Sequence, residues 1–508
     1  MFIKKAITFK SPWLIIIIFS TLGLIGILNH SMWRDELNPW LIVRDSESFG
    51  DLIANIHYEG HPVLWYFCLA VLRRIAENPV LMQLFHLAIA IFSVSIFCLY
   101  SPFNYQQKFL FSFGFFPFNE YLLISRNYAF SMLFIFAACT VFPSRKKTYI
   151  YLAILLGLLA NSSAYALLVS FAFLLTLLVE FCFDSEHRKQ YFHQSHKYDL
   201  FLSLGIIIFT LLLSVYIITP PADSYLHGGL NDGWVNQFDL RQVFRSLGRL
   251  FGSYFLIIPT HKRWLDLIVC GCIVLFILAV TGIKLSKKPF ALFFYIIGNS
   301  IILAFTYLRF LGQPRHFGHL YLILIAGLWL GNYYAESRFL INKFSLKSQT
   351  IKLGEKWHYI AFMLILYVQV IGGIASFTKD LIIPYSASRE TANYILRNQL
   401  NDEFIVASRD ANMAAISGYL GRKLYYPELQ DMGSFTLFKA GRKDVEQPEI
   451  LAQISDLFTT QADSKKILLI LNKKLNVNRD NLQIVPIQSF EKAWVDDERY
   501  YLYWVNKV

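Results

Sequence analysis

Long apolar segments separated by short polar turns occupy most of the chain up to residue 378. A helix needs about 17–25 predominantly apolar residues to cross a bilayer. Segments of that length predict membrane-spanning helices at 12–28, 79–99, 164–183, 199–219, 264–281, 289–308, 317–335 and 357–378. Shorter apolar segments are compatible with tilted spans or with broken helices inside a bundle, and these are 62–76, 109–124, 128–142 and 149–160.

The pattern changes after Pro384, where polarity becomes ordinary and no segment is long enough to span a membrane. Short β-rich runs occur at 404–407, 467–471, 482–487 and 500–505, and helical periodicity occurs near 388–400, 411–420 and 448–458. We therefore predict an α-helical polytopic membrane domain over residues 1–383, with about 10–12 transmembrane helices. Residues 384–508 are predicted to form a small extracytoplasmic α/β domain.

Composition agrees with a membrane location. Of the 508 residues, 55% are hydrophobic and 16% are charged, whereas soluble domains average about 45–50% apolar and about 25% charged residues. The mean hydropathy is +0.43. These values exclude a cytosolic enzyme and a disordered scaffold. The six cysteines lie in or beside apolar runs without zinc-ligand spacing, so we expect no disulfide framework.

The net charge of +12 fits cytoplasmic loops rich in Lys and Arg, rather than binding to nucleic acid. The N-terminus carries Lys4, Lys5 and Lys10 and lacks a cleavage site after its apolar run, so we expect an uncleaved first span with a cytoplasmic N-terminus. Further cytoplasmic loops are predicted at 145–147, 187–197, 284–288 and 338–356. The protein is thus expected in the cell (plasma or inner) membrane.

Alternation from these loops places the remaining loops outside the cytoplasm, at 29–61, 125–128, 161–163, 219–263 and 309–318, together with all residues after Thr378. One conflict arises. Three apolar segments lie between His61 and Arg126, although an even number of crossings is needed there. Either 62–76 or 109–124, which Pro117 interrupts, is expected not to cross.

Adjacent carboxylates follow the first span in Trp33-Arg34-Asp35-Glu36. In a cleft, one such carboxylate can act as a general base toward an acceptor hydroxyl or amine, and the pair can also hold a divalent cation. The alternative is a solvated acid pair in which Asp35 caps the helix that follows.

A second polar cluster contains His57, Glu59 and His61, just before Pro62. Two histidines and a glutamate within five residues can bind metal or phosphate. The alternative is a helix start at Pro62 followed by an interfacial aromatic belt. The two histidines share a helix face only if a helix continues through Gly60, which argues against a zinc site.

Two arginine-containing segments are also predicted to lie outside the cytoplasm, where arginine is disfavoured. The first holds Arg126 and Tyr128, and a guanidinium at this depth suits a phosphate, although Glu120 is an alternative ion-pair partner. The second holds Arg309, Arg315 and His316, which fit an anionic headgroup. The alternative there is a snorkelling anchor on bulk lipid phosphate. No nucleotide-binding motif accompanies these groups.

Taken in order, these motifs resemble the GT-C superfamily of membrane glycosyltransferases, and more narrowly the bacterial branch of glycosyltransferase family 39, which includes relatives of protein O-mannosyltransferases and aminoarabinose transferase. The resemblance covers residues 1–335 and has one departure, Val63 in place of a second proline. The matching residues are Asp35-Glu36, His61-Pro62-Val63-Leu64, Arg126-Asn127-Tyr128 and Arg315-His316.

The resemblance implies inverting transfer of a sugar from a polyprenyl-phosphate-linked donor, at the outer membrane face, to a glycan, lipid or protein. Asp35 is then the expected base and Glu36 a supporting or metal-holding group. Arg126, Arg315 and His316 are expected to stabilise the departing phosphate, with His61 lining the same cleft. The resemblance makes no cofactor certain, and a divalent metal ion at Asp35 and Glu36 stays open.

Two other functions use similar features. A polysaccharide polymerase or ligase also takes a lipid-linked donor, but the early Asp-Glu pair argues against it. A transporter of lipid-linked sugars predicts paired repeats and acidic residues near mid-membrane. The chain has no such repeat, and its charged residues cluster at the outer ends of predicted spans.

Overall fold

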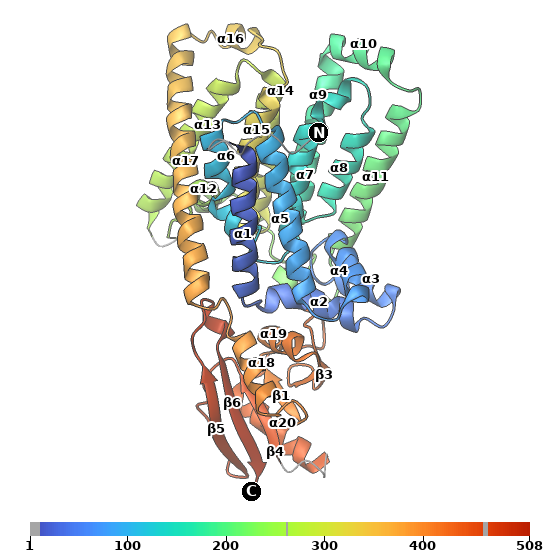
Figure 1. Cartoon of the computed structure of the whole chain (residues 1–508), viewed down its shortest axis with the longest axis vertical. Coiled ribbons are helices and arrows are strands. Elements are labelled where there is room, and N and C mark those ends of the chain that lie inside the picture. The colour runs from blue at the N-terminus through green and yellow to red at the C-terminus, as the bar shows by residue number, and fades with distance from the viewer. Residues whose placement is uncertain (1–10, 261–262, 461–465) are drawn as a thin grey trace.

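Apolar helices form one bundle, and a mixed sheet domain is attached to one end of it (Figure 1). The computed structural model describes residues 11–260, 263–460 and 466–508, so Lys4, Lys5 and Lys10 lie outside the described part. Within that part, eight helices are long and apolar enough to cross a membrane. They are α1 (Pro12–Asn29), α5 (Val80–Tyr100), α7 with its 3-10 extension (Tyr128–Lys146), α9 (Ala164–Phe183), α11 (Asp199–Ile218), α13 (Trp264–Leu285), α14 (Pro289–Leu308) and α17 (Ser348–Ile382).

Three less apolar or shorter segments also connect the two ends of the bundle. They are α15 (Pro314–Gly331), α8 (Ile150–Ala160) and α6 (Tyr105–Ser112) with the π-helical turn η1 (Phe116–Glu120). Helix α15 is buried almost all round, so other helices rather than lipid surround its polar residues. The predicted helical membrane fold with a small C-terminal sheet domain is confirmed.

The broken segment α6–η1 resolves the parity conflict. Pro117 lacks a backbone N–H and interrupts regular helix at this point. The segment packs against α1 and α17 and returns the chain from α5 to Arg126. By contrast, α4 (Leu64–Ile75) stays at the end of the bundle that carries the sheet domain (Figure 1). Segment 62–76 is therefore the one that does not cross.

We call the end of the bundle that carries the sheet domain the site end. The short helices α2 (Arg34–Asp45) and α3 (Phe49–Ile56) lie there with α4 (Figure 1). The basic segments that contain α10 (Ser185–Gln194) and α16 (Phe339–Lys343) lie at the opposite end. The amphipathic helix α12 (Leu240–Phe255) packs against α13 and α15.

The C-terminal domain contains one sheet with strand order β3-β2-β1-β4-β6-β5. Its strands are β1 (Ile405–Ser408), β2 (Leu424–Tyr426), β3 (Asp431–Gly433), β4 (Lys466–Leu471), β5 (Leu482–Phe490) and β6 (Tyr500–Lys507). Strand β1 is parallel to β2 and β4, whereas the other pairings are antiparallel. The sequence predicted every strand except the three-residue β2 and β3.

Helices cover both faces of this sheet. One face packs against α18 (Ser388–Arg397) and α19 (Asp410–Leu420), and the other against α20 (Gln447–Thr460). Helix α19 also packs directly on α2. A Cβ atom on Gly418 would lie 3.1 Å from the Leu37 side chain, so the missing side chain allows this close approach. The sheet domain is thus in contact with the helix that carries Asp35.

Candidate active site

Asp35 lies in the first turn of α2 and is surrounded by arginines. Its Oδ2 atom is 2.9 Å from Arg315 Nη2 and 3.4 Å from Arg126 Nη1, and Arg126 also donates to the Asp35 backbone carbonyl. Arg34 is a third neighbour, at 3.9 Å from Oδ1. Burial alone raises the pKa of Asp35, but the charges of Arg315 and Arg126 dominate and hold it below its ordinary value. Asp35 is therefore an ionised carboxylate with weakened basicity.

His61 is neutral and supports Arg126. The Arg126 Nη2 atom donates to His61 Nε2 over 3.0 Å, which requires an unprotonated Nε2. Burial and the nearby charges of Arg126 and Arg315 lower the pKa of His61 to about 3. An arginine held by one carboxylate and one imidazole has few rotamers left, so its remaining N–H groups are fixed in direction.

Tyr128 and His316 form a second hydrogen-bonded pair. The backbone N–H of Gln313 donates to His316 Nδ1 over 2.9 Å, so the neutral imidazole carries its proton on Nε2. That proton is donated to the Tyr128 hydroxyl, 2.7 Å away. Tyr128 therefore keeps its own proton for another acceptor. Tyr165 stacks on His316 with ring centroids 5.1 Å apart and extends the cluster.

Glu36 points away from this cluster into the protein interior. It is fully buried and accepts hydrogen bonds from Ser125 N (2.6 Å), His30 Nε2 (2.9 Å) and Trp33 N (3.3 Å). Because Asp35 faces arginines and Glu36 faces His30, the two carboxylates do not share a free coordination site. No cluster of three potential metal ligands occurs among the described residues. The side chain of Glu36 thus contacts His30 and the backbone of Ser125 and Trp33 rather than the arginines beside Asp35.

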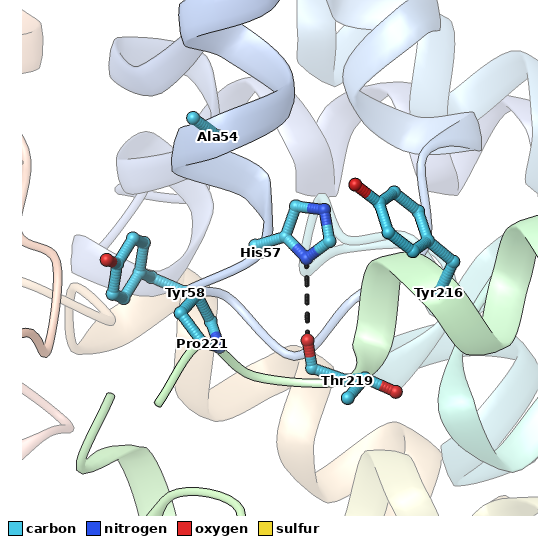
Figure 2. A pocket seen from close by; sticks show the side chains of 6 residues that line it. All are labelled: Ala54, His57, Tyr58, Tyr216, Thr219 and Pro221. Atoms are coloured by element: carbon cyan, nitrogen blue, oxygen red, sulfur yellow. Dashed lines mark hydrogen bonds between the residues drawn. The ribbon is translucent and has the colours of Figure 1, made fainter. Parts of the chain in front are cut away.

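Two of the predicted site residues lie elsewhere. His57 lines an open groove of about 480 Å³ between α3 and α11, with its ring centroid 4.8 Å from that of Tyr216 (Figure 2). Arg309 donates to the backbone carbonyls of Gly229 and Asp232, and its guanidinium lies 5.0 Å from the Trp234 ring centroid. His57 therefore lies beside the start of the loop that follows α11, and Arg309 contacts a later part of the same loop.

The structure shows a different acidic partner for Arg126 from the one considered in the sequence. Its acidic partner is Asp35, and no ion pair with Glu120 occurs between these two described residues. Arg315 has no acidic residue within its own loop, yet it too pairs with Asp35, which is 280 positions away in sequence. Neither arginine is an unpaired cation at rest.

A further arginine was not predicted from the sequence. Arg249 in α12 is only 8% exposed, and its side chain has no ion pair or hydrogen bond among the described residues. Burial and the adjacent charge of Arg245 lower its pKa. Arg249 interacts electrostatically with Tyr165 and lies 6.0 Å from the Phe317 ring centroid, next to His316. The available signal was the spacing of Arg241, Arg245 and Arg249 along one helix face.

Glu59 is a second residue whose setting the sequence did not reveal. It is held by Asn38 Nδ2 at 3.0 Å and by the Tyr66 hydroxyl at 3.1 Å. Burial raises the pKa of Glu59 to about 7, although the charge of Arg126 opposes the shift. The carboxyl of Glu59 thus titrates near neutral pH, and it lies two positions before His61 in the same segment.

The transmembrane bundle, the short helices at the site end and the attached sheet domain define a polytopic helical membrane fold. The chain shares this fold with the crystal structure of ArnT from Cupriavidus metallidurans bound to undecaprenyl phosphate. The two are 10% identical, the match covers 97% of each chain, and the TM-score is 0.52. At this identity the similarity establishes the fold and not the activity.

A second solved structure is less similar. The arabinofuranosyltransferase AftD from Mycobacteria is 9% identical, with 96% of this chain and 41% of that chain covered and a TM-score of 0.34. No family model matches the sequence, and no curated protein matches it. Membership of glycosyltransferase family 39 stays a prediction.

Proposed function

We propose that this protein is a membrane glycosyltransferase that moves a sugar from a polyprenyl-phosphate carrier to an acceptor by inverting transfer. The observation that carries the proposal is one ionised carboxylate, Asp35, surrounded by more cationic groups than it neutralises. Arg126 and Arg315 contact it, while the buried Arg249 forms no ion pair with any acid in the described part of the chain. A buried cation is costly without an anionic partner, and a phosphate is such a partner.

The donor class follows from the setting of these cations in a bundle of apolar helices. A polyprenyl chain fits the bilayer while its phosphate reaches the site end. The fold agrees, because ArnT shares it and that protein was crystallised with undecaprenyl phosphate. The acceptor is expected to be a glycan, lipid or protein of the cell envelope. The hexosyl or pentosyl identity of the sugar is set by contacts to the donor's ring.

The chemistry needs a base for the acceptor and cations for the leaving group. In the proposed step the acceptor O–H or N–H gives its proton to Asp35, and the acceptor atom attacks the anomeric carbon. The bond between that carbon and the phosphate oxygen breaks, and the phosphate leaves with the electron pair. Arg126, Arg315 and the Tyr128 hydroxyl donate to its oxygens. When the phosphate takes up these donors, the basicity of Asp35 rises at the moment the base is needed.

The orientation in the membrane is part of the proposal. Basic segments lie at the end of the bundle opposite the site end, as the positive-inside rule requires if the site end is extracytoplasmic. We therefore place the N-terminus in the cytoplasm of the cell that carries this protein in its plasma or inner membrane. Asp35 and the sheet domain then face outward.

The test uses the full chain in lipid nanodiscs with undecaprenyl phosphate as the probe. We expect binding to the wild type, and a roughly tenfold or greater loss of affinity in Arg249→Gln because one charge-assisted phosphate contact disappears. Arg309→Gln is the matched control, since Arg309 contacts the carbonyls of Gly229 and Asp232 and the Trp234 ring, away from Asp35. Mass spectrometry of cell-envelope glycolipids with and without the protein then tests transfer. Absence of binding by the wild type, or no glycan difference, overturns the proposal.

A further inference from the structure

A buried histidine joins three helices beside the proposed active site. His30 follows α1, and its Nδ1 atom lies 3.0 Å from Asp380 Oδ2 in the last turn of α17. Its Nε2 atom lies 2.9 Å from Glu36 Oε2 in α2. The exposed fractions of the His30, Glu36 and Asp380 side chains are 1%, 0% and 3%. Water therefore contributes little to the solvation of these three groups.

Both ring nitrogens of His30 face carboxylates, so both act as donors and the ring is an imidazolium. Burial alone lowers the pKa of His30, but the charges of Asp380 and Glu36 raise it to about 10. Other described polar groups at this point include Asn29, which donates to the Asp380 carbonyl at 3.1 Å, and Gln83 and Arg389, which both donate to the His30 carbonyl. The ring of Tyr385 lies with its centroid 5.1 Å from that of His30. The histidine is thus charged throughout the physiological pH range.

The opposite side of Glu36 leads directly to Arg126. Glu36 Oε1 accepts the backbone N–H of Ser125 over 2.6 Å, a short charge-assisted hydrogen bond. Arg126 is the next residue, and its guanidinium contacts both the side chain and the backbone carbonyl of Asp35. Because this hydrogen bond holds the Ser125 backbone, it also holds the backbone position from which the Arg126 side chain extends.

We propose that His30 and Asp380 are positioning residues that hold Glu36 in place, so that Glu36 anchors the Ser125–Arg126 segment against Asp35. This inference rests on the proposed function for its effect on turnover. It deepens that function by explaining why Glu36, the acid next to Asp35, is fully buried and does not face Arg126 and Arg315.

The same contacts connect the site to the sheet domain. Asp380 lies at the end of α17, and α18 follows it within the sheet domain. Ser388 in α18 donates to the Met32 carbonyl over 2.9 Å, between His30 and α2. The segment that carries His30 is therefore held from both the membrane domain and the sheet domain.

The test compares His30→Gln and Asp380→Asn with His358→Gln as the matched control. His358 is a buried histidine on the same helix as Asp380, but it hydrogen-bonds to Thr281, 3.2 Å away, and forms no ion pair within the described part of the chain. We expect His30→Gln to lower kcat by about 10–100-fold, because a displacement near 1 Å at a reacting centre costs about 100-fold. Asp380→Asn keeps an acceptor for His30 and should cost less. His358→Gln should leave kcat unchanged.

A double-mutant cycle separates positioning from general damage. If His30 acts through Arg126, adding His30→Gln to Arg126→Gln should cost less than about twofold more, because coupled residues are not additive. Losses that multiply overturn the proposal. Each activity is measured well below the Tm of that variant, so a lower stability does not imitate a lower kcat.

An experimental structure of His30→Gln in nanodiscs gives a readout that needs no turnover. We expect the Ser125–Glu36 hydrogen bond to break and the Arg126 guanidinium to move away from Asp35. An unchanged Arg126–Asp35 contact overturns the proposal whatever the activity. If Arg126 moves but the wild type transfers no sugar from a polyprenyl-phosphate donor, the positioning role stands and the proposed function fails.

Discussion

Replacing Arg315 by glutamine should move the acid limb of the pH–rate profile toward neutral pH. Arg315 Nη2 lies 2.9 Å from Asp35 Oδ2, and this charge is the strongest influence lowering the pKa of Asp35 against its burial. A group with a lowered pKa stays ionised down to acidic pH. In the proposed reaction, Asp35 can therefore accept a proton from the acceptor over a wide pH range in the wild type. Loss of the Arg315 charge raises the pKa of Asp35. The pH range in which Asp35 is ionised then begins at a higher pH.

The size of the shift follows from the geometry. Two unit charges about 4 Å apart interact by about 4 kcal/mol at an effective dielectric constant of about 20. Asp35 is 25% exposed, so solvent screens part of this interaction, and Arg126 still pairs with it in the variant. A neighbouring arginine typically lowers a carboxyl pKa by about 1–3 units. Because solvent screens part of the interaction, we expect Arg315→Gln to raise the pKa of Asp35 by about 1–2 units.

The assay is kcat/KM against pH, which reports ionisations of the free enzyme. The wild type, Arg315→Gln and Arg309→Gln are compared with one polyprenyl-phosphate-linked sugar. Arg309 belongs to the same loop but contacts the carbonyls of Gly229 and Asp232, so its variant should keep the wild-type acid limb. An acid limb at the same pH in Arg315→Gln and the wild type refutes Asp35 as the titrating base.

Three further outcomes are expected. Asp35→Asn should lower turnover by about 10²–10⁴-fold, the usual range for loss of a general base, with an unchanged Tm in thermal unfolding; near-normal turnover would reject Asp35 as base. Arg145→Met should destabilise the bundle by about 3–5 kcal/mol, because it leaves Glu180, bound at 2.8 Å and 2% exposed, as an unpaired buried charge; a Tm equal to the wild type in detergent contradicts this. A phosphatase reporter fused after Val508 should be active outside the cytoplasm, and cytoplasmic activity reverses the proposed topology.

Local sequence determined the elements of this protein. A run of apolar residues fixes a transmembrane helix because its backbone groups bond within the segment and its side chains need only an apolar surrounding. The spans at 79–99 and 199–219, and the strands at 467–471 and 500–505, were predictable for this reason. The order of polar motifs along the chain also predicted, through its resemblance to the GT-C superfamily, the fold that the chain shares with ArnT.

Only the tertiary structure decided which charges meet. Arg315 and Asp35 are separated by 280 positions and touch because α15 and α2 reach the site end together. The loop of Arg315 contains no acid, so local sequence suggested an unpaired arginine. Pairing of side chains depends on distances in space, and the hydropathy of a segment carries no information about them.

The same limit applies to Asp35 and Glu36. They are adjacent in sequence, but successive residues of an α-helix point about 100° apart, so one faces the arginines and the other faces His30. The different neighbours of the two carboxylates, and the lack of an ion pair at Arg249 among the described residues, came from packing between distant helices. The sequence determined which functional side chains are present, and the packing of the bundle determined which of their atoms lie close together.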